Sequence, residues 1–121
     1  MTDIFPLLFV AHMLGDWVIQ TDAQALAKMS SWRAMGGHVL TYHLTMAVIV
    51  VPFWHDRWTL LGFALSAVSH GFIDRRWPVK WLLSHTGSAK FSELPLGALS
   101  ADQALHSIFL ALMAVIFQVT R

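Results

Sequence analysis

Four apolar stretches, each close to the length at which a helix crosses a membrane, constrain this chain more than any other feature of its sequence. Hydrocarbon about 30 Å thick takes roughly 20 helical residues to cross. The stretches cover residues 4–25, 37–54, 58–74 and 101–119. They predict an all-α polytopic membrane protein, in which a single domain, residues 1–121, forms an antiparallel bundle of four transmembrane helices. Residues 78–100 are expected to form an interfacial segment and a loop.

The composition favours a membrane setting and excludes several kinds of protein. Hydrophobic residues make up 56% of the chain and charged residues 12%, whereas soluble domains have roughly 25% charged residues. The net charge of +1 argues against nucleic acid as a partner, because binding phosphates needs a large basic patch. The chain has no cysteine, so any metal must be held by His, Asp, Glu or Gln. A compact soluble helical bundle is the alternative, favoured by the shortness of the last three stretches.

The basic residues predict how the bundle is oriented, because Lys and Arg favour the cytoplasmic side of a membrane. Six of the eight fall in the two connections on one side of the predicted bundle: Lys28, Arg33, Arg75, Arg76, Lys80 and Lys90. Arg57 and Arg121 fall on the other side. We therefore expect a multi-pass protein with its basic connections in the cytoplasm and both termini outside. The first stretch is not preceded by the basic region of a signal peptide, so it is expected to remain in the mature protein.

Ionisable side chains inside the predicted helices are the main indication of function. Each costs about 2.5–3.5 kcal/mol to insert into hydrocarbon, so such residues are rare unless they have a role. Three pairs are spaced four residues apart, each pair on one helix face: His12 and Asp16, His70 and Asp74, and Asp102 and His106. The order within the pair reverses on the last helix, which runs opposite to the first and third. The three aspartates therefore lie nearer the cytoplasm, and at about 1.5 Å per residue the pairs predict a layer about 5–15 Å deep, with His12 below it.

This layer predicts a metal site. Its carboxylates and imidazoles need a compensating positive charge, which a metal ion or shared protons would supply. His and Asp suit Zn²⁺, Mn²⁺ or Fe²⁺, and their number leaves room for two ions. The candidate ligands are His12, Asp16, His43, His70, Asp74 and His106. For any one pair, the alternative is a polar contact between helices worth about 0.6 kcal/mol.

Four further polar residues have expected roles beside these ligands. Gln20 and Gln103 are expected to orient ligands through hydrogen bonds. His38 is expected to do the same, although it falls at the predicted membrane edge, where an interfacial position is an equal alternative. Asp102 is either another ligand or a general base, which makes it the candidate catalytic residue.

The motifs that carry these residues resemble those of a known family. Residues 11–21 (AHMLGDWVIQT) are similar to the opening motif of a bacterial and phage membrane family, domain-of-unknown-function family 3307. Apart from residues 80–97, the similarity covers nearly the whole chain and includes His38 and His43, His70 and Asp74, and the closing Asp102, Gln103 and His106. The resemblance implies a protein of the bacterial inner membrane, from a host or a phage, and implies no activity. A looser similarity connects the pattern to membrane-bound metal-dependent hydrolases.

The leading functional prediction is a metal-dependent membrane hydrolase that acts on a lipid headgroup or an amphiphilic phosphate. A metal ion makes hydroxide available at neutral pH, and Arg75, Arg76 and Lys80 are expected to hold an anionic group. The first alternative is a non-enzymatic phage or bacterial accessory protein, whose buried polar groups serve only to join helices. The second is transport of metal ions or protons, which would require a homo-oligomer of such short helices. The lipid bilayer is the expected partner in all three cases.

Overall fold

The structure, a computed structural model, describes residues 3–120, most of which are helical. In chain order the elements are α1 (Ile4–Met13), the π-helical turn η1 (Leu14–Val18), α2 (Asp22–Ala27), α3 (Trp32–Val50), α4 (Arg57–Ile73), α5 (Trp77–His85), α6 (Ala89–Glu93) and α7 (Gly97–Val119). The all-α class predicted from the sequence is confirmed.

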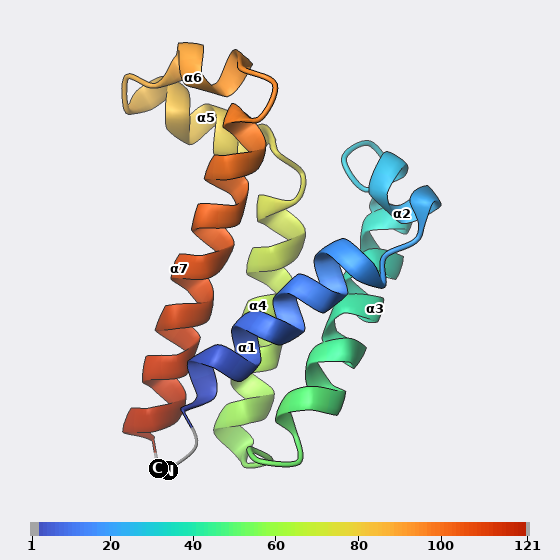
Figure 1. The fold of residues 1–121 in the computed structure, drawn as a ribbon, viewed down its shortest axis with the longest axis vertical. Coiled ribbons are helices and arrows are strands. Elements are labelled where there is room, and N and C mark those ends of the chain that lie inside the picture. Colours follow the sequence, from blue (N-terminus) through green and yellow to red (C-terminus); the bar gives the residue numbers. More distant parts are fainter. Residues whose placement is uncertain (1–2, 121) are drawn as a thin grey trace.

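Four of these elements surround a common interior. Helices α3, α4 and α7 run along the long axis of the molecule, and α1 crosses them obliquely (Figure 1). Both α1 and α4 pack against α3 and α7. The short helices α2, α5 and α6 gather at the end opposite the beginning of α1 and the end of α7 (Figure 1). Six basic residues lie on or beside these short helices, whereas Arg121, also used to predict the orientation, lies outside the described residues.

The prediction of four transmembrane helices is wrong. Among residues 3–120, α7, with 23 residues, is the one helix that is both long and apolar enough to cross a membrane. The first predicted span is interrupted, because the helical stretch Ile4–Val18 is followed by a bend. Helix α4 has 17 residues and is too short, while α3 has 19 but contains Arg33, His38 and His43, which lower its hydropathy. The polar residues that predict a site therefore also reduce the membrane character of the helix that carries them.

The connections are more helical than the sequence predicts. After the bend at residues 19–20, the Thr21 hydroxyl accepts a hydrogen bond from the Gln24 N–H (3.2 Å), and Gln24 Oε1 accepts one from the Thr21 N–H (2.9 Å). This capping box starts α2. The predicted interfacial segment and loop contain α5 and α6, and α7 begins at Gly97 instead of residue 101. A Cβ at Gly97 would lie 1.7 Å from the Phe91 carbonyl oxygen, so glycine is what allows α6 to fold tightly onto the start of α7.

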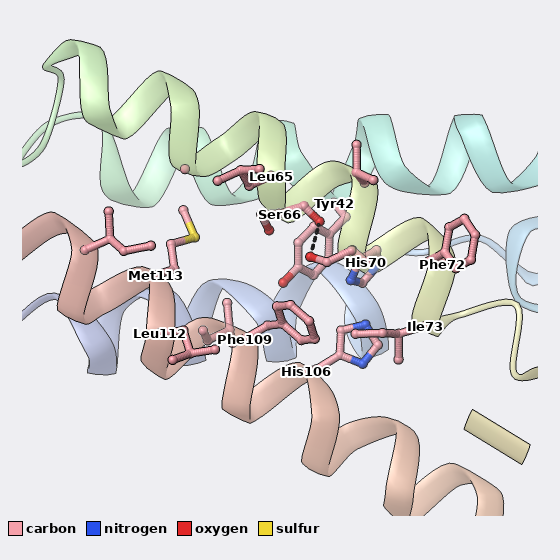
Figure 2. Close-up of a pocket in the computed structure, with 15 residues that line it drawn as sticks. Tyr42, Leu65, Ser66, His70, Phe72, Ile73, His106, Phe109, Leu112 and Met113 are labelled. Carbon is pink, nitrogen blue, oxygen red and sulfur yellow. Dashed lines mark hydrogen bonds between the residues drawn. The ribbon is translucent and has the colours of Figure 1, made fainter. Parts of the chain in front are cut away.

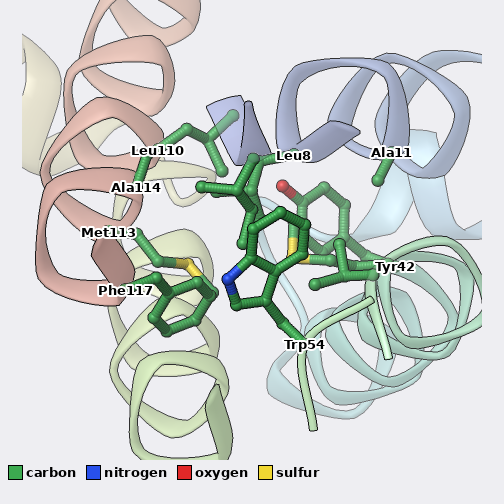
Figure 3. Close-up of a cluster of buried hydrophobic side chains, with 11 residues drawn as sticks. Leu8, Ala11, Tyr42, Trp54, Leu110, Met113, Ala114 and Phe117 are labelled. Carbon is green, nitrogen blue, oxygen red and sulfur yellow. The ribbon is translucent and has the colours of Figure 1, made fainter. Parts of the chain in front are cut away.

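The hydrophobic core occupies the half of the interior away from the short helices. Trp54 comes shortly after α3, and its ring inserts between Leu8 of α1 and Phe117 of α7 (Figure 3). Trp54 is 4% exposed and Phe117 2%. Gly62 lets α4 approach α7, because a Cβ there would lie 2.3 Å from Phe117 Cε1. Apolar packing thus fixes the four long elements at this end and leaves the polar residues at the other.

The outer surface is apolar between two charged ends. Large hydrophobic side chains are exposed on the outward faces of the long helices, including Leu44 (59%), Val68 (69%) and Leu112 (54%). Among the described residues, the exposed Lys, Arg, Asp and Glu side chains lie at helix ends or on the short helices: Asp3, Asp22, Arg33, Asp56, Arg57, Lys80, Lys90 and Glu93. Soluble monomers rarely expose apolar surface as extensive as this.

Candidate metal centre

Six acidic and imidazole side chains meet in the interior near the short helices. Their positions are Asp16 on η1, His38 on α3, His70 on α4 and Asp74 at its C-terminus, and Asp102 and His106 on α7. Each is at most 3% exposed. Burying so many ionisable groups is costly unless they are paired or bound to a cation, so their contacts decide what the cluster can do.

Two of the carboxylates lie where a helix departs from α-helical geometry or ends. Asp16 lies in the π-helical turn, in which the Ile19 N–H bonds to the Leu14 carbonyl oxygen five residues earlier (2.9 Å). Asp74 is the C-cap of α4, and its N–H bonds to the His70 carbonyl oxygen (3.0 Å). Single π-helical turns inside α-helices are frequent at functional sites. Asp16 thus lies in an irregular turn and Asp74 at the regular end of a helix, and both carboxylates are buried.

The first cluster consists of Asp16, His38, His70 and Asp74. His38 Nε2 lies 2.9 Å from Asp74 Oδ2, 3.2 Å from Asp16 Oδ1 and 2.9 Å from His70 Nε2. His70 Nε2 lies 3.4 Å from Asp74 Oδ2. Two ligand atoms bound tetrahedrally to one ion at about 2.1 Å are themselves about 3.4 Å apart. The four side chains are thus close enough together to hold a metal ion.

The second cluster consists of Asp74, Asp102 and His106. His106 Nδ1 lies 2.8 Å from Asp102 Oδ1, and His106 Nε2 lies 3.5 Å from Asp74 Oδ1. One ligand atom from each of the three residues can be chosen so that all lie within 4.8 Å of one another, a spacing that also allows a metal ion. Asp74 belongs to both clusters and presents a different carboxylate oxygen to each.

Lys28 is a member of the centre that the sequence analysis missed. Its Nζ lies 2.9 Å from Asp16 Oδ1 and 2.7 Å from Asp74 Oδ2, and 3.3 Å from His38 Nε2. Its side chain is only 13% exposed. From the sequence, Lys28 is expected only to favour the cytoplasmic side, as one of the basic residues in a connection between helices. The capping box at the start of α2 was the available signal, because a short helix there turns the chain back over the interior.

The charges in the centre stabilise one another. Burial disfavours the ammonium form of Lys28, but the Asp74 and Asp16 carboxylates outweigh this and raise the pKa of Lys28 above its usual 10.5. Burial also opposes ionisation of Asp74, yet the hydrogen bond from His38 and the nearby positive charges lower its pKa from 3.8 to about 2. The pKa of Asp16 is lowered in the same way, by His38 and Lys28 against burial. Both carboxylates are therefore ionised at neutral pH, which is the form that binds a metal.

His12 is tied into a chain of hydrogen bonds and is not part of either cluster. Its Nδ1 lies 3.1 Å from the Tyr42 hydroxyl and its Nε2 3.0 Å from Gln103 Oε1. Because a neutral imidazole donates from one nitrogen and accepts at the other, Tyr42 donates to Nδ1 while Nε2–H donates to Gln103. Gln103 Nε2 in turn donates to Asp16 Oδ2 (3.1 Å). His12 therefore helps to orient Asp16 through Gln103, and both of its nitrogens are occupied.

His43 and Gln20 also lie outside the clusters. His43 Nδ1 donates to the Val39 carbonyl oxygen (2.8 Å), and its Nε2 accepts from the Ser66 hydroxyl (3.1 Å). Gln20 Nε2 donates to the Asp16 carbonyl oxygen. The structure thus assembles Asp16, His70, Asp74, Asp102 and His106 as candidate ligands, and adds His38.

A polar cavity of about 170 Å³ opens onto the centre from the end that carries the short helices. Arg76 lines it, with Nε 3.6 Å from Asp102 Oδ2. Arg76 has a φ of 60°, a left-handed conformation that costs a non-glycine residue about 1–3 kcal/mol. Arg75 instead donates to the Lys28 carbonyl oxygen (3.2 Å) and stacks over Trp32, and Lys80 is exposed on α5. Of the three residues predicted to hold an anion, Arg76 is the one that borders this cavity.

Comparison with known proteins places the chain in a family. A family model described as "Protein of unknown function (DUF3307)" matches residues 4–121. The match covers almost the whole chain, so the chain belongs to this family, and the resemblance predicted from its motifs is confirmed. No curated protein and no solved structure matches.

Proposed function

We propose, for this member of a family without an assigned activity, that the centre binds two divalent metal ions and that the loaded protein hydrolyses the phosphate ester of an amphiphile. The position of Asp74 carries the proposal. Its Oδ2 contacts His38 and its Oδ1 approaches His106, so one carboxylate would bridge two ions. A pair of ions about 3.5–4 Å apart is the arrangement found in many phosphatases and nucleases.

The residues around the polar cavity have the chemistry that such a reaction needs. A bound metal ion would supply hydroxide at neutral pH and stabilise charge on the phosphate. Asp102 either completes the second ion's ligands or accepts a proton from the attacking water. The Arg76 guanidinium, held beside Asp102 at the cavity, would bind phosphate oxygens, for which its planar donors are well suited.

Metal analysis provides the first test. Wild-type protein, purified without chelator and supplied with zinc or manganese, is expected to hold two ions per chain, one for each cluster. Asp102→Ala is expected to hold one, because the first cluster stays intact. Hydrolysis of p-nitrophenyl phosphate by the wild type should stop when EDTA is added and resume with metal. A wild-type chain that binds neither ion, measured by mass spectrometry, would overturn the proposal.

Lys28 favours a second candidate function in which the centre needs no metal. Its ammonium group already pairs with Asp16 and Asp74. In that case the protein would be a non-enzymatic accessory protein, and the paired charges would hold its helices together. Removing one member of such a buried cluster is strongly destabilising. The same metal analysis separates the two functions, because the accessory protein would remain metal-free at millimolar zinc or manganese.

We also propose that lipid covers the apolar band around the middle of the molecule. The exposed hydrophobic side chains occur on the outward faces of several helices, whereas a protein partner would cover one side. Helix α7, which is long and apolar enough to cross a membrane, would anchor the protein in the bilayer. In bacterial cells the protein is expected in the inner-membrane fraction, to resist extraction with carbonate and to be released by detergent. Recovery in the soluble fraction without detergent would contradict this.

A further inference from the structure

A second cavity, of about 510 Å³, lies between α4 and α7. Its walls include Leu65 and Phe72 of α4 and Phe109 and Leu112 of α7 (Figure 2). Its lining contains no Lys, Arg, Asp or Glu among the described residues. Volumes of about 300–1,000 Å³ with mostly apolar walls are typical of small-molecule sites. An uncharged, apolar group is the occupant that such walls favour.

Two imidazoles of the metal centre form part of this cavity's wall. They are His70 and His106, whose ring centroids are 4.6 Å apart (Figure 2). His70 is 2% exposed, and its Nδ1 has no hydrogen-bond partner among residues 3–120. The apolar cavity therefore borders the centre, and its wall includes a histidine with an unpartnered ring nitrogen.

The other side of the cavity reaches the apolar outer surface. Three residues on this side of the cavity are about half exposed: Leu65 (55%), Phe109 (45%) and Leu112 (54%). The polar cavity, by contrast, reaches the centre between Lys28 and Arg76. The centre thus borders an apolar cavity between α4 and α7 and a polar cavity, lined by both basic and acidic groups, beneath the short helices.

We infer that the cavity between α4 and α7 binds the long apolar chain of the substrate, while the substrate's phosphate group lies at the metal centre and is reached by water through the polar cavity. The inference rests on the proposed function and makes the substrate class specific: a phosphate monoester with one long hydrocarbon chain. Neither cavity alone fits such a molecule, because the apolar cavity has no cation for the phosphate and the polar cavity is lined by charged groups.

Binding of two non-hydrolysable probes tests the inference. Dodecyl phosphonate and ethyl phosphonate share a headgroup and differ in chain length. Zinc-supplied protein in amphipol is expected to bind the dodecyl probe at least about tenfold more tightly, because burying two methylene groups already contributes about that factor. Leu65→Trp fills the cavity from its exposed wall and should abolish the preference without changing metal content. Leu112→Trp, on the opposite wall, should act in the same way.

Leu60→Trp is the matched control, because Leu60 is exposed on the same helix and does not line the cavity. It should keep the wild-type preference. A wild type that holds metal but binds both probes equally would overturn the inference and leave the metal centre standing. So would folded Leu65→Trp and Leu112→Trp proteins, checked by circular dichroism, that keep the preference. A wild type without metal that still prefers the dodecyl probe, and loses this preference in Leu65→Trp, would support the chain site and overturn the proposed function.

Discussion

Asp74→Ala is expected to leave the protein without bound zinc or manganese. Asp74 Oδ2 lies 2.9 Å from His38 Nε2, and Oδ1 lies 3.5 Å from His106 Nε2, so the change removes a ligand from both clusters. Losing residues that merely orient metal ligands lowers affinity about 10–100-fold, and losing a bridging ligand should lower it by more than 100-fold. Titration with zinc, followed by mass spectrometry of the washed protein, measures this.

A variant that changes only one cluster tests whether the loss of metal from Asp74→Ala depends on Asp74 being shared by both clusters. Asp102→Ala should retain one ion where Asp74→Ala retains none, since only Asp74 is shared by the two clusters. Asp22→Ala removes an exposed carboxylate at the start of α2 and should retain both ions. If Asp74→Ala keeps as much metal as Asp102→Ala, Asp74 does not bridge.

Lys28→Met is expected to destabilise the metal-free protein strongly. The change leaves the Asp16 and Asp74 carboxylates buried without the ammonium group that lies 2.9 and 2.7 Å from them. Removing one partner of a buried ion pair typically costs about 3–5 kcal/mol. Metal should restore stability, because an ion would neutralise the same oxygens, and a ligand at 1,000 times its Kd adds about 4 kcal/mol. Thermal unfolding with EDTA and with zinc measures both effects.

The pH dependence of this loss follows from the pKa shifts of Lys28 and Asp74. Lys28 has a raised pKa, so its contribution is complete below pH 10.5 and is lost as the pH rises through its folded value. Asp74 has a pKa lowered from 3.8 to about 2, so its contribution is complete above about pH 4 and is lost as the pH falls through 2. The stability difference between the wild type and Lys28→Met should shrink above pH 10.5 and at acid pH, where the carboxylates left without Lys28 become protonated.

Lys80→Met is the control for the loss of a positive charge, because Lys80 is exposed on α5. It should unfold like the wild type with or without zinc. Equal stability of metal-free Lys28→Met and wild type would show that the centre does not depend on the ammonium group.

The spacing of the polar residues made much of the centre predictable. Residues four apart share a helix face, and the reversed order of Asp102 and His106 indicated that the last helix presents its pair at the same level as His70 and Asp74. The structure places these four residues together. The spacing of residues along the chain does not predict how each helix is rotated about its own axis relative to its neighbours. His38 lies inside the first cluster although the sequence placed it at the membrane edge, and the rings of His12 and His43 are directed to other partners.

The errors in the fold have a common cause. The predicted spans run through residues 19–25, where Gln20, Thr21, Asp22 and Gln24 are polar, and through residues 51–54, which lie beyond the end of α3 at Val50. A π-helical turn and a bend end the first helical stretch near Val18, and Thr21 starts α2 with its own cap. The prediction of a continuous helix to residue 25 missed the start of α2. It also concealed Lys28, whose place in the centre depends on the chain turning there.

The π-helical turn also sets a limit on the length of the chain between His12 and Gln20. Each residue of a regular helix advances the direction of the side chain by about 100°. A π-helical turn holds one residue more than an α-helical turn. Deleting one residue from η1 would therefore restore a regular helix and leave α1 in place, with Leu8 and His12 still buried, but would move the Asp16 carboxylate away from its partners. Among related chains, those with one residue fewer between the histidine and the glutamine should therefore keep the core and lose this position of the aspartate.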